Sequence, residues 1–214
     1  MTALLSRGTI IMPTGKRDKA SQKKRDKIIQ TTMRLLLKKG SLTSTTDICT
    51  AAKLTRPTLY HYFGSKRNLL LSVHMEGIER DLKPYIAEAL SINDPLKRLI
   101  YMIRTHMKII CLHPELRVLI HDTLTTKDRY FREVKGEWKK HYVLLRDTIG
   151  ELRSKGIIST TAKPSMAALF VLGMLTWTTY WFDYSRKEDI DHIADQAVEM
   201  VLNGLGCARQ IIRK

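Results

Sequence analysis

A basic stretch near the amino terminus contains two predicted short helices, roughly 45–52 and 56–63, joined by a tight turn. The second predicted helix leaves four polar side chains pointing outward: Arg56, Thr58, Tyr60 and His61. Two helices joined in this way form a helix-turn-helix, whose second helix enters the major groove of DNA. Arginine prefers guanine there, and the threonine methyl can contact thymine. The chemistry expected of this stretch is therefore binding of double-stranded DNA.

Small and apolar residues must position this helix pair against a preceding helix. The contacts that pin the pair are expected from Ile48, Ala51, Ala52, Leu54 and Leu59. The preceding helix is predicted over roughly 21–40, where apolar residues recur at intervals of three and four. Ser44 or Thr45 is a cap candidate for the first short helix. Thr55 caps the second, whose first turn accepts Pro57 because the missing N–H costs little there.

The distribution of charge supports an anionic partner for the amino-terminal third. The chain has 37 Lys and Arg against 21 Asp and Glu, a net charge of +16. Residues 1–83 hold 17 basic and 6 acidic residues, whereas residues 84–214 hold 20 and 15. Such a bias predicts contact with nucleic acid or an anionic membrane surface, or else a solvated tail. A membrane-surface helix needs a broad apolar face beside its charges. Here, the apolar stripe that follows Lys23–Lys27 is better used against the helix pair.

Several other classes of protein are disfavoured by the sequence. No apolar run approaches the roughly 18–20 residues of a membrane span, and Arg7 interrupts the segment where a secretory signal would stand. The three cysteines fit no disulfide framework or metal-ligand spacing, which favours the cytoplasm. The sequence contains no Walker loop, dinucleotide-binding glycine pattern, His-Glu-x-x-His or Gly-x-Ser-x-Gly. We therefore expect a protein that is not an enzyme and that uses neither cofactor nor metal.

The rest of the chain keeps a helical pattern and shows no strand-like alternation or repeat. We predict an all-α fold of about nine helices, in which a three-helix head precedes a larger helical domain. The expected divisions are a flexible basic arm at 1–20, the helix-turn-helix domain at 21–66, a connecting helix at 67–83 and the larger domain at 84–214.

The stretch Asp-Ile-Cys-Thr-Ala-Ala-Lys-Leu-Thr-Arg-Pro-Thr-Leu-Tyr-His-Tyr-Phe-Gly-Ser-Lys, residues 47–66, resembles the signature of TetR-family regulators. The Thr-Leu-Tyr-x-x-Phe-x-Ser-Lys portion, followed by the apolar pair Leu69 and Leu70, is specific to this family. The resemblance is strong over residues 21–70 and extends more loosely to the helical plan of the whole chain. One residue departs from the pattern, because Lys53 stands in the turn where the family usually has glycine.

The resemblance implies a set of DNA contacts. Thr45 and Thr46 begin the first short helix, where hydroxyls and free backbone N–H groups suit phosphate. Tyr60, His61 and Lys66 are expected to hold phosphates, and Lys53 adds a further phosphate contact, whereas Tyr62 and Phe63 are expected in the core. The complete predicted DNA-binding set is Thr45, Thr46, Lys53, Thr55, Arg56, Pro57, Thr58, Tyr60, His61 and Lys66.

Regulators of this kind dimerise to read a palindrome, because a single helix binds one half-site too weakly. The last two predicted helices, roughly 164–184 and 187–204, carry continuous apolar stripes. Two such helices from each subunit would form a four-helix bundle. We therefore expect a homodimer through these helices; the alternative is that both stripes belong only to the core of one chain.

Aromatic and methionine side chains with few polar anchors suggest a site for an apolar ligand in the larger domain. The predicted ligand-binding set is Arg104, Met107, Tyr130, Trp138, His141, Tyr142, Arg146, Met174, Trp177 and Trp181. A second resemblance concerns Gly173, Trp177 and Trp181, which match the Gly-x-x-x-Trp-x-x-x-Trp helix of one TetR subgroup.

That subgroup includes regulators of fatty-acid and sterol catabolism that respond to acyl-CoA thioesters. The resemblance implies a small-molecule effector such as an acyl-CoA, with its acyl part in the apolar core and its phosphates against Arg or Lys near the opening. The alternative is a TetR-type regulator of efflux that responds to a cationic drug-like compound, which would favour buried acids in the pocket helices.

Overall fold

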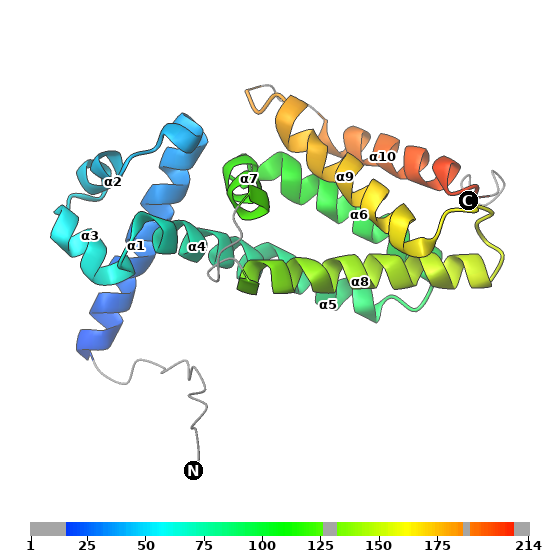
Figure 1. Cartoon of the computed structure of the whole chain (residues 1–214), viewed down its shortest axis with the longest axis horizontal. Coiled ribbons are helices and arrows are strands. Elements are labelled where there is room, and N and C mark those ends of the chain that lie inside the picture. The colour runs from blue at the N-terminus through cyan, green and yellow to red at the C-terminus, as the bar shows by residue number, and fades with distance from the viewer. Residues whose placement is uncertain (1–15, 126–131, 186–188, 208–214) are drawn as a thin grey trace, which may run out of the picture.

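The computed structural model describes residues 16–125, 132–185 and 189–207, and throughout these ranges the regular structure is helical (Figure 1). The α-helices are α1 (Lys16–Lys39), α2 (Thr45–Ala52), α3 (Arg56–Phe63), α4 (Lys66–Gly77), α5 (Lys83–Ser91), α6 (Pro95–Leu112), α7 (Leu116–Thr125), α8 (Arg132–Ser154), α9 (Pro164–Trp181) and α10 (Ile190–Gly204). A 3₁₀ turn (Gly40–Leu42) follows α1, and a π-helical turn (Ile78–Leu82) joins α4 to α5. Counting α4, the π turn and α5 as one helix gives nine in the described residues, so the all-α prediction is confirmed.

The head is built from α1, α2, α3 and the beginning of α4. Its core consists of Ile28, Ile29, Met33, Leu36, Ile48, Cys49, Leu59, Phe63, Leu69, Val73 and Leu119. Ten of these residues belong to the helices of the head, but Leu119 comes from α7. The larger domain therefore contributes one buried side chain to the core of the head.

The first helix begins earlier than the sequence pattern predicted. Residues 16–20, which we expected in a flexible arm, form the first turns of α1, while residues 1–15 lie outside the described part of the chain. Lys, Arg, Ala and Gln are good helix formers and need no apolar stripe to continue a helix once it has begun. A hydrogen bond between Gln22 Nε2 and Asp26 Oδ1 (2.7 Å) adds a stabilising i,i+4 pair to this exposed part.

The connecting helix does not end at Lys83 as predicted but continues through Pro84 to Ser91. Proline lacks the N–H that would bond to the carbonyl of residue 80, and its ring crowds that carbonyl. The π-helical turn over Ile78–Leu82 widens the helix immediately before the proline and accommodates it. One nearly continuous rod thus runs from the head into the larger domain (Figure 1).

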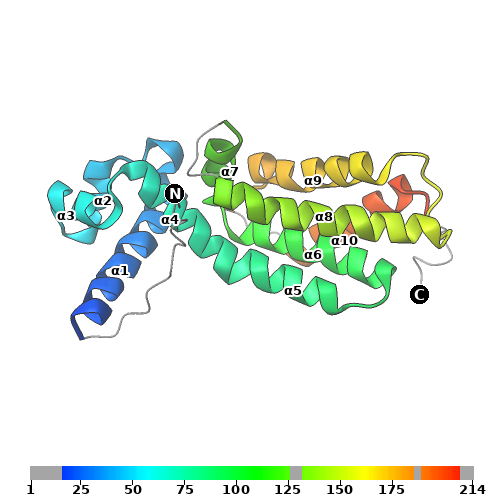
Figure 2. The same ribbon diagram turned by 60° about the horizontal axis from the view of Figure 1, so that its bottom comes forward.

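The larger domain packs α5, α6, α8, α9 and α10 around one apolar core, and Figure 2 shows α5, α6 and α8 running side by side. Leu99, Ile103, Leu145, Ile149 and Leu202 are among its fully buried members. The short α7 contacts both α4 and α9. In the described residues, no helix combines the length and apolar character needed to cross a membrane.

Candidate DNA-binding and effector sites

The start of α2 is fixed by a reciprocal cap. Ser44 accepts a hydrogen bond from the backbone N–H of Asp47, and the Asp47 carboxylate accepts one from the backbone N–H of Ser44. Lys39 donates a hydrogen bond to the same carboxylate, which holds the pKa of Asp47 well below its usual range. Ser44 is therefore the cap of α2. Thr45 and Thr46 occupy its first two positions, with the Thr46 side chain exposed.

The turn between α2 and α3 contains a strained lysine. Lys53 has φ 54° and ψ 54°, the one positive φ among the described residues other than glycine. A left-handed conformation costs a non-glycine residue about 1–2 kcal/mol. The backbone N–H of Lys53 bonds to the carbonyls of Cys49 and Thr50, which ends α2. The turn therefore has the backbone form that glycine would adopt freely, but it carries an exposed ammonium group.

At the start of α3, hydrogen bonds orient the residues predicted to read bases. The Thr55 hydroxyl caps the helix by accepting from the backbone N–H of Thr58, and the two threonine hydroxyls lie 2.9 Å apart. The Arg56 guanidinium donates to the Thr46 hydroxyl across the turn (Nη2–Oγ1 2.8 Å). Arg56 is thus held over the first turn of α2 while remaining exposed to solvent.

The remaining residues of the predicted DNA-binding set lie on the surface of the head. Pro57, Tyr60 and His61 are exposed on α3, and Lys66 is half-buried at the start of α4. Phe63 is buried, and Tyr62 packs against the same core, as predicted for both. The helix-turn-helix lies at the end of the head remote from the larger domain (Figure 1).

One residue that supports the head was not identified from the sequence. Arg25 on α1 donates a hydrogen bond to the Ser72 hydroxyl on α4 (2.9 Å), and its guanidinium lies 5.1 Å from the centre of the Phe63 ring. It thereby fixes the first helix against the end of α3. Because the partners are 47 residues apart, no local pattern points to this contact.

In the larger domain, polar side chains meet inside the apolar core. The Tyr85 hydroxyl on α5 lies 2.7 Å from Nε2 of His141 on α8 and also donates to the Met102 carbonyl on α6 (3.2 Å). The His106 ring stacks on His141 with ring centres 5.4 Å apart, and its buried Nε2 atom has no hydrogen-bond partner among the described residues. Burial lowers the pKa of His106 to about 4. Burial, and then the neighbouring His106, lower that of His141 to about 3. Both imidazoles are therefore neutral at pH 7.

This interior includes or borders several residues of the predicted ligand-binding set. Met107 is buried, and its sulfur accepts a weak hydrogen bond from the Thr178 hydroxyl on α9 (3.9 Å). Tyr142 packs against the same core, beside His141. Trp138 lies nearer the start of α8, where the centre of its ring is 5.5 Å from that of the buried His74 ring on the connecting helix. Burial lowers the pKa of His74 to about 4.

Other members of the predicted ligand-binding set face outward in the single chain. Arg104 forms an ion pair with Asp195 on α10, and Arg146 forms one with Asp147 on its own helix. Met174, Trp177 and Trp181 lie on the exposed face of α9, where the Trp177 side chain is 62% exposed. Tyr130 lies outside the described residues. The structure thus gathers Met107, His141 and Tyr142 inside the domain and leaves the two tryptophans of α9 on its surface.

Tyr85, which joins the interior cluster, was absent from the predicted set. It was overlooked because the proline before it suggested the end of a helix, whereas the π turn carries the helix onward and points Tyr85 into the core. One signal in the sequence points to polar groups in the core: the histidines at positions 74, 106 and 141 each lie within a helical apolar pattern.

Similar proteins include a curated relative and many solved structures. The chain is 25% identical over 189 residues to an uncharacterised HTH-type transcriptional regulator, YvaF, of Bacillus subtilis, covering 84% of this chain and 94% of the relative. The fold resembles that of AibR in complex with isovaleryl coenzyme A and operator DNA, with 24% identity and a TM-score of 0.75 over 83% of this chain and 97% of AibR. It also resembles the fatty acid degradation regulator FadR of Bacillus halodurans, with 21% identity and a TM-score of 0.69 over 86% and 97%.

Two family models match the two parts of the chain. Residues 28–73 match the bacterial regulatory proteins of the tetR family, and residues 93–205 match the tetracyclin repressor-like C-terminal domain. The second match alone covers more than half of the chain. Members of this family are DNA-binding transcription factors and not enzymes. The chain therefore belongs to the TetR family of transcriptional regulators.

Proposed function

We propose that this TetR-family regulator is a cytoplasmic repressor that binds a palindromic operator as a homodimer and releases it on binding a small amphipathic ligand such as an acyl-CoA. The observation that carries the proposal is the placement of Leu119. This residue lies on α7 of the larger domain and is buried in the core of the head. A displacement of α7 by a ligand therefore has to disturb the packing of the DNA-binding helices.

In the proposed complex with DNA, α3 lies in the major groove. Arg56 reads a guanine and Thr58 contacts a thymine methyl, while Tyr60, His61 and Lys66 bind phosphates. The hydrogen bond from Arg56 to Thr46 supports this role, because it restrains a long side chain close to the groove before DNA arrives. Thr45 and Thr46 add phosphate contacts from the first turn of α2.

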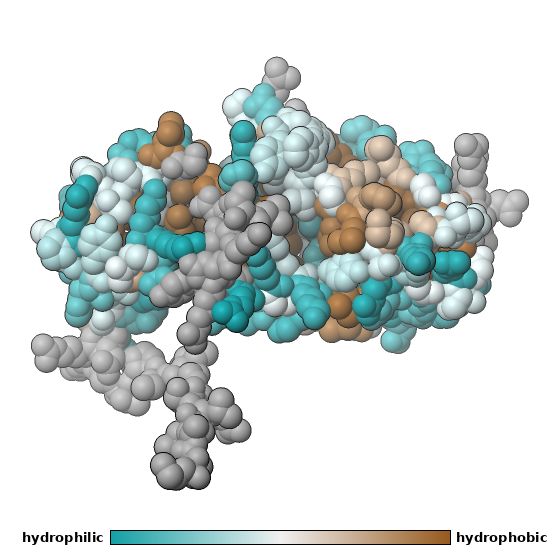
Figure 3. Space-filling view, in the orientation of Figure 1, coloured by the Kyte–Doolittle hydropathy of each residue, from teal (hydrophilic) through white to brown (hydrophobic). Residues whose placement is uncertain are grey.

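The homodimer is supported by an apolar face on α9 that the single chain leaves uncovered. Figure 3 shows apolar side chains gathered over this helix. The exposed large apolar residues of α9 are Met166, Leu169, Phe170, Met174, Trp177, Tyr180 and Trp181, and Met200 adds another from α10. An exposed apolar patch of this kind marks an interaction site on a protein surface. We propose that the occupant is the same face of a second copy, related by a twofold axis.

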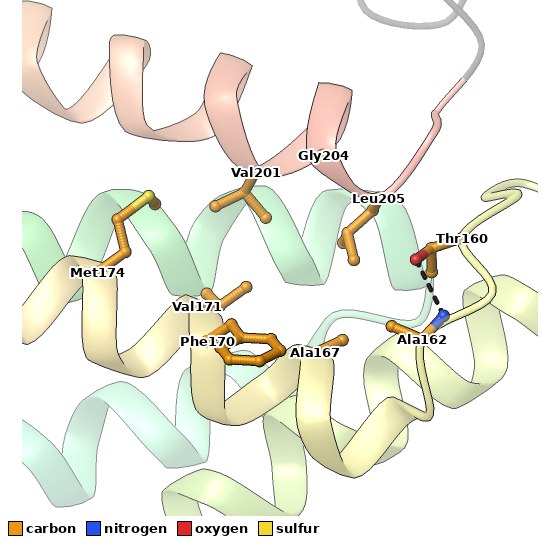
Figure 4. Close-up of a pocket in the computed structure, with 9 residues that line it drawn as sticks. All are labelled: Thr160, Ala162, Ala167, Phe170, Val171, Met174, Val201, Gly204 and Leu205. Atoms are coloured by element: carbon orange, nitrogen blue, oxygen red, sulfur yellow. Dashed lines mark hydrogen bonds between the residues drawn. The ribbon is translucent and has the colours of Figure 1, made fainter.

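A groove between α9 and α10 gives this interface its shape. Its volume is about 190 Å³, and its walls include Phe170 and Val171 from α9, Val201 from α10 and Leu205 directly after α10 (Figure 4). The Phe170 side chain is 67% exposed beside the groove. In a four-helix bundle, the corresponding aromatic ring of the second copy would fill such a space. Dimerisation would thus bury the surface that carries Trp177 and Trp181.

The proposed effector site lies in the interior around Tyr85, His106, Met107, His141 and Thr178. An unpartnered buried nitrogen such as His106 Nε2 carries an unsatisfied hydrogen-bonding capacity. The apolar walls suit an acyl chain, and the neutral imidazoles suit a polar but uncharged group such as a thioester carbonyl. The related AibR binds isovaleryl coenzyme A, and FadR regulates fatty acid degradation. Exposed arginines such as Arg104 are candidates to meet the phosphates of CoA.

The same interior disfavours the alternative of a cationic drug. Recognition of a buried cation calls for a carboxylate close to it. The polar side chains described in this interior are histidines, a tyrosine and threonines, and the buried Glu115, just before α7, lies within hydrogen-bond distance of His113. An anionic amphiphile that keeps its charge at the surface is the better match.

The proposed mechanism is a shift between two states. Ligand between α5, α6, α8 and α9 displaces α7 and the rod formed by α4 and α5. The head then moves with Leu119 and the start of α4, and the two recognition helices of the dimer no longer match successive major grooves.

The proposal is tested by mobility-shift titrations of DNA flanking the protein's own gene, with and without a panel of acyl-CoAs that includes isovaleryl-CoA. We expect a specific shift that one thioester abolishes. The variant His106→Phe should keep the shift and lose the response to that thioester, whereas the matched surface variant His192→Phe should keep both. A specific shift that persists with every thioester would contradict the proposed effector class.

A further inference from the structure

A groove on the head, between α1 and the turn that leads from α2 into α3, is lined by four lysines. It has a volume of about 370 Å³, and α1 and the turn after α2 form its walls. The lysines are Lys23, Lys24, Lys27 and Lys53, and the other lining residues are Ile28, Ala52 and Leu54. All four lysine side chains are exposed, and none is paired with a carboxylate among the described residues.

The position of these lysines is not explained by the core of the head. Lys27 follows Lys23 by four residues and Lys24 by three, so it is a surface neighbour of both along α1. They precede the buried Ile28 and are themselves exposed, so these three side chains take no part in the packing of the head. Lys53 completes the groove from the opposite wall, in a left-handed conformation that glycine would adopt without strain.

Four like charges that converge on one open groove repel each other unless an anion lies between them. Lysine is a flexible point charge that suits phosphate oxygens without requiring a fixed geometry. The groove is open to solvent and has no enclosed polar floor for a small anion. One of its walls is the turn that leads into α3, since Lys53 is three residues before Arg56. A long polyanion that already contacts α3 therefore fits it better than a free ion.

We propose that this lysine groove is a second phosphate site, which binds the DNA backbone beside the base pairs that α3 reads. The proposal rests on the DNA binding proposed above and adds a contact that is independent of base sequence. Lys53 belongs both to the turn of the helix-turn-helix and to the wall of the lysine groove. Its side chain therefore extends the proposed DNA-binding surface from the helix-turn-helix onto α1.

The test uses a duplex of mixed sequence, so that no operator needs to be known, and measures affinity as a function of salt concentration. Each neutralised phosphate contributes about 0.9 to the slope of log affinity against log salt. For Lys53→Gly, we expect the slope to fall by about one for each head and affinity to fall about tenfold for each head near 0.1 M salt. The thermal midpoint of Lys53→Gly should rise, because glycine relieves the left-handed strain.

The opposite directions of these two effects exclude misfolding as the cause of weaker binding. The matched control is Lys97→Ala, which removes one exposed charge from the larger domain and should leave the slope unchanged. The triple variant Lys23→Ala, Lys24→Ala, Lys27→Ala tests the other wall of the groove. Alanine is a good helix former, so α1 should persist while the slope falls by at least one for each head.

Three outcomes distinguish the possibilities. If wild type binds DNA and both lysine variants have the wild-type salt slope, the proposed phosphate site in the groove is wrong and the proposed function stands. Wild type that binds neither mixed-sequence DNA nor any selected DNA would overturn both. Stabilisation of wild type, but not of Lys53→Gly, by inorganic phosphate at matched ionic strength, with unchanged DNA slopes, would show that the groove serves a free phosphate ligand instead.

Discussion

The recognition helix α3 and the interior between α5, α6 and α8 both carry polar side chains, but the two regions differ in exposure and charge. Arg56, Tyr60 and His61 face solvent in a part of the molecule rich in lysine. His141 is buried, His106 lies partly buried against it, and both are neutral at pH 7. The polar groups of α3 are thus open to solvent, whereas the His141 ring and the Nε2 atom of His106 are enclosed.

This difference shows how each region meets its ligand. Exposed cations attract a polyanion over a distance and retain their water until it arrives. Buried neutral groups lose that water when the protein folds, so they favour a ligand that brings an apolar body and few charges. The link between the two regions is α7, whose Leu119 belongs to the core of the head.

The largest expected effect is the loss of stability in acid, which comes from the interior. His74, His106 and His141 have pKa values lowered to about 4, 4 and 3 by burial, so the unfolded chain binds more protons below about pH 6.5. Stability is therefore complete above that pH and falls as the pH drops toward 4. Together the three histidines contribute roughly 4 kcal/mol per pH unit in this window. Urea unfolding at pH 7, 6 and 5 measures the slope.

The origin of this slope is checked by substitution of the two interior histidines. A double variant, His106→Phe with His141→Phe, should have a slope shallower by roughly 3 kcal/mol per pH unit. If the free energy of unfolding of wild type does not change between pH 6.5 and 4.5, the interior histidines do not differ from exposed ones in the way proposed.

Truncation of Leu119, the α7 side chain that is buried in the core of the head, should destabilise the head. Leu119 is only 3% exposed, and Leu119→Ala should lower the free energy of unfolding by about 2–4 kcal/mol. The matched control is Leu112→Ala, at a position 61% exposed, which should change stability by less than about 0.5 kcal/mol. If both variants were equally stable in chemical denaturation, α7 would not join the two regions.

The substitution Arg56→Ala should affect DNA binding without affecting stability. We expect a loss of about 1–3 kcal/mol in operator affinity and a relaxed preference at one base pair. Urea unfolding should be unchanged within about 0.5 kcal/mol, because the guanidinium is exposed. Selection from a random DNA library compares the preferences of the two proteins. Equal selectivity would show that α3 does not read bases through this residue.

The smallest of these effects concerns the cap of α2. Ser44→Ala removes the hydrogen bond to the backbone N–H of Asp47 and should cost about 1 kcal/mol. Ser44→Gly should cost only a few tenths of a kcal/mol, which separates the cap from other effects of the hydroxyl. Thermal unfolding is sensitive enough to resolve the two variants, and equal midpoints would argue against the capping box.

The parts that could be predicted from the sequence are those that local chemistry decides. The Thr55 cap follows from neighbours within a few residues, whereas the glycine-like turn at Lys53 and the core position of Phe63 are what the family resemblance implies. The contact between Tyr85 and His141 spans 56 residues, and no periodicity in either helix encodes it. The exposure of Trp177 to solvent could not be predicted from the sequence either. A helix that is apolar on most faces does not reveal which face meets its own core.

The most direct test of the account is whether DNA and effector bind with reciprocal coupling. We would measure by calorimetry the affinity for the acyl-CoA that releases DNA, with and without saturating operator duplex. The account predicts that operator weakens thioester binding by the same factor by which thioester weakens operator binding, because both sites bias one equilibrium. An affinity for the thioester that is the same with and without operator would contradict it.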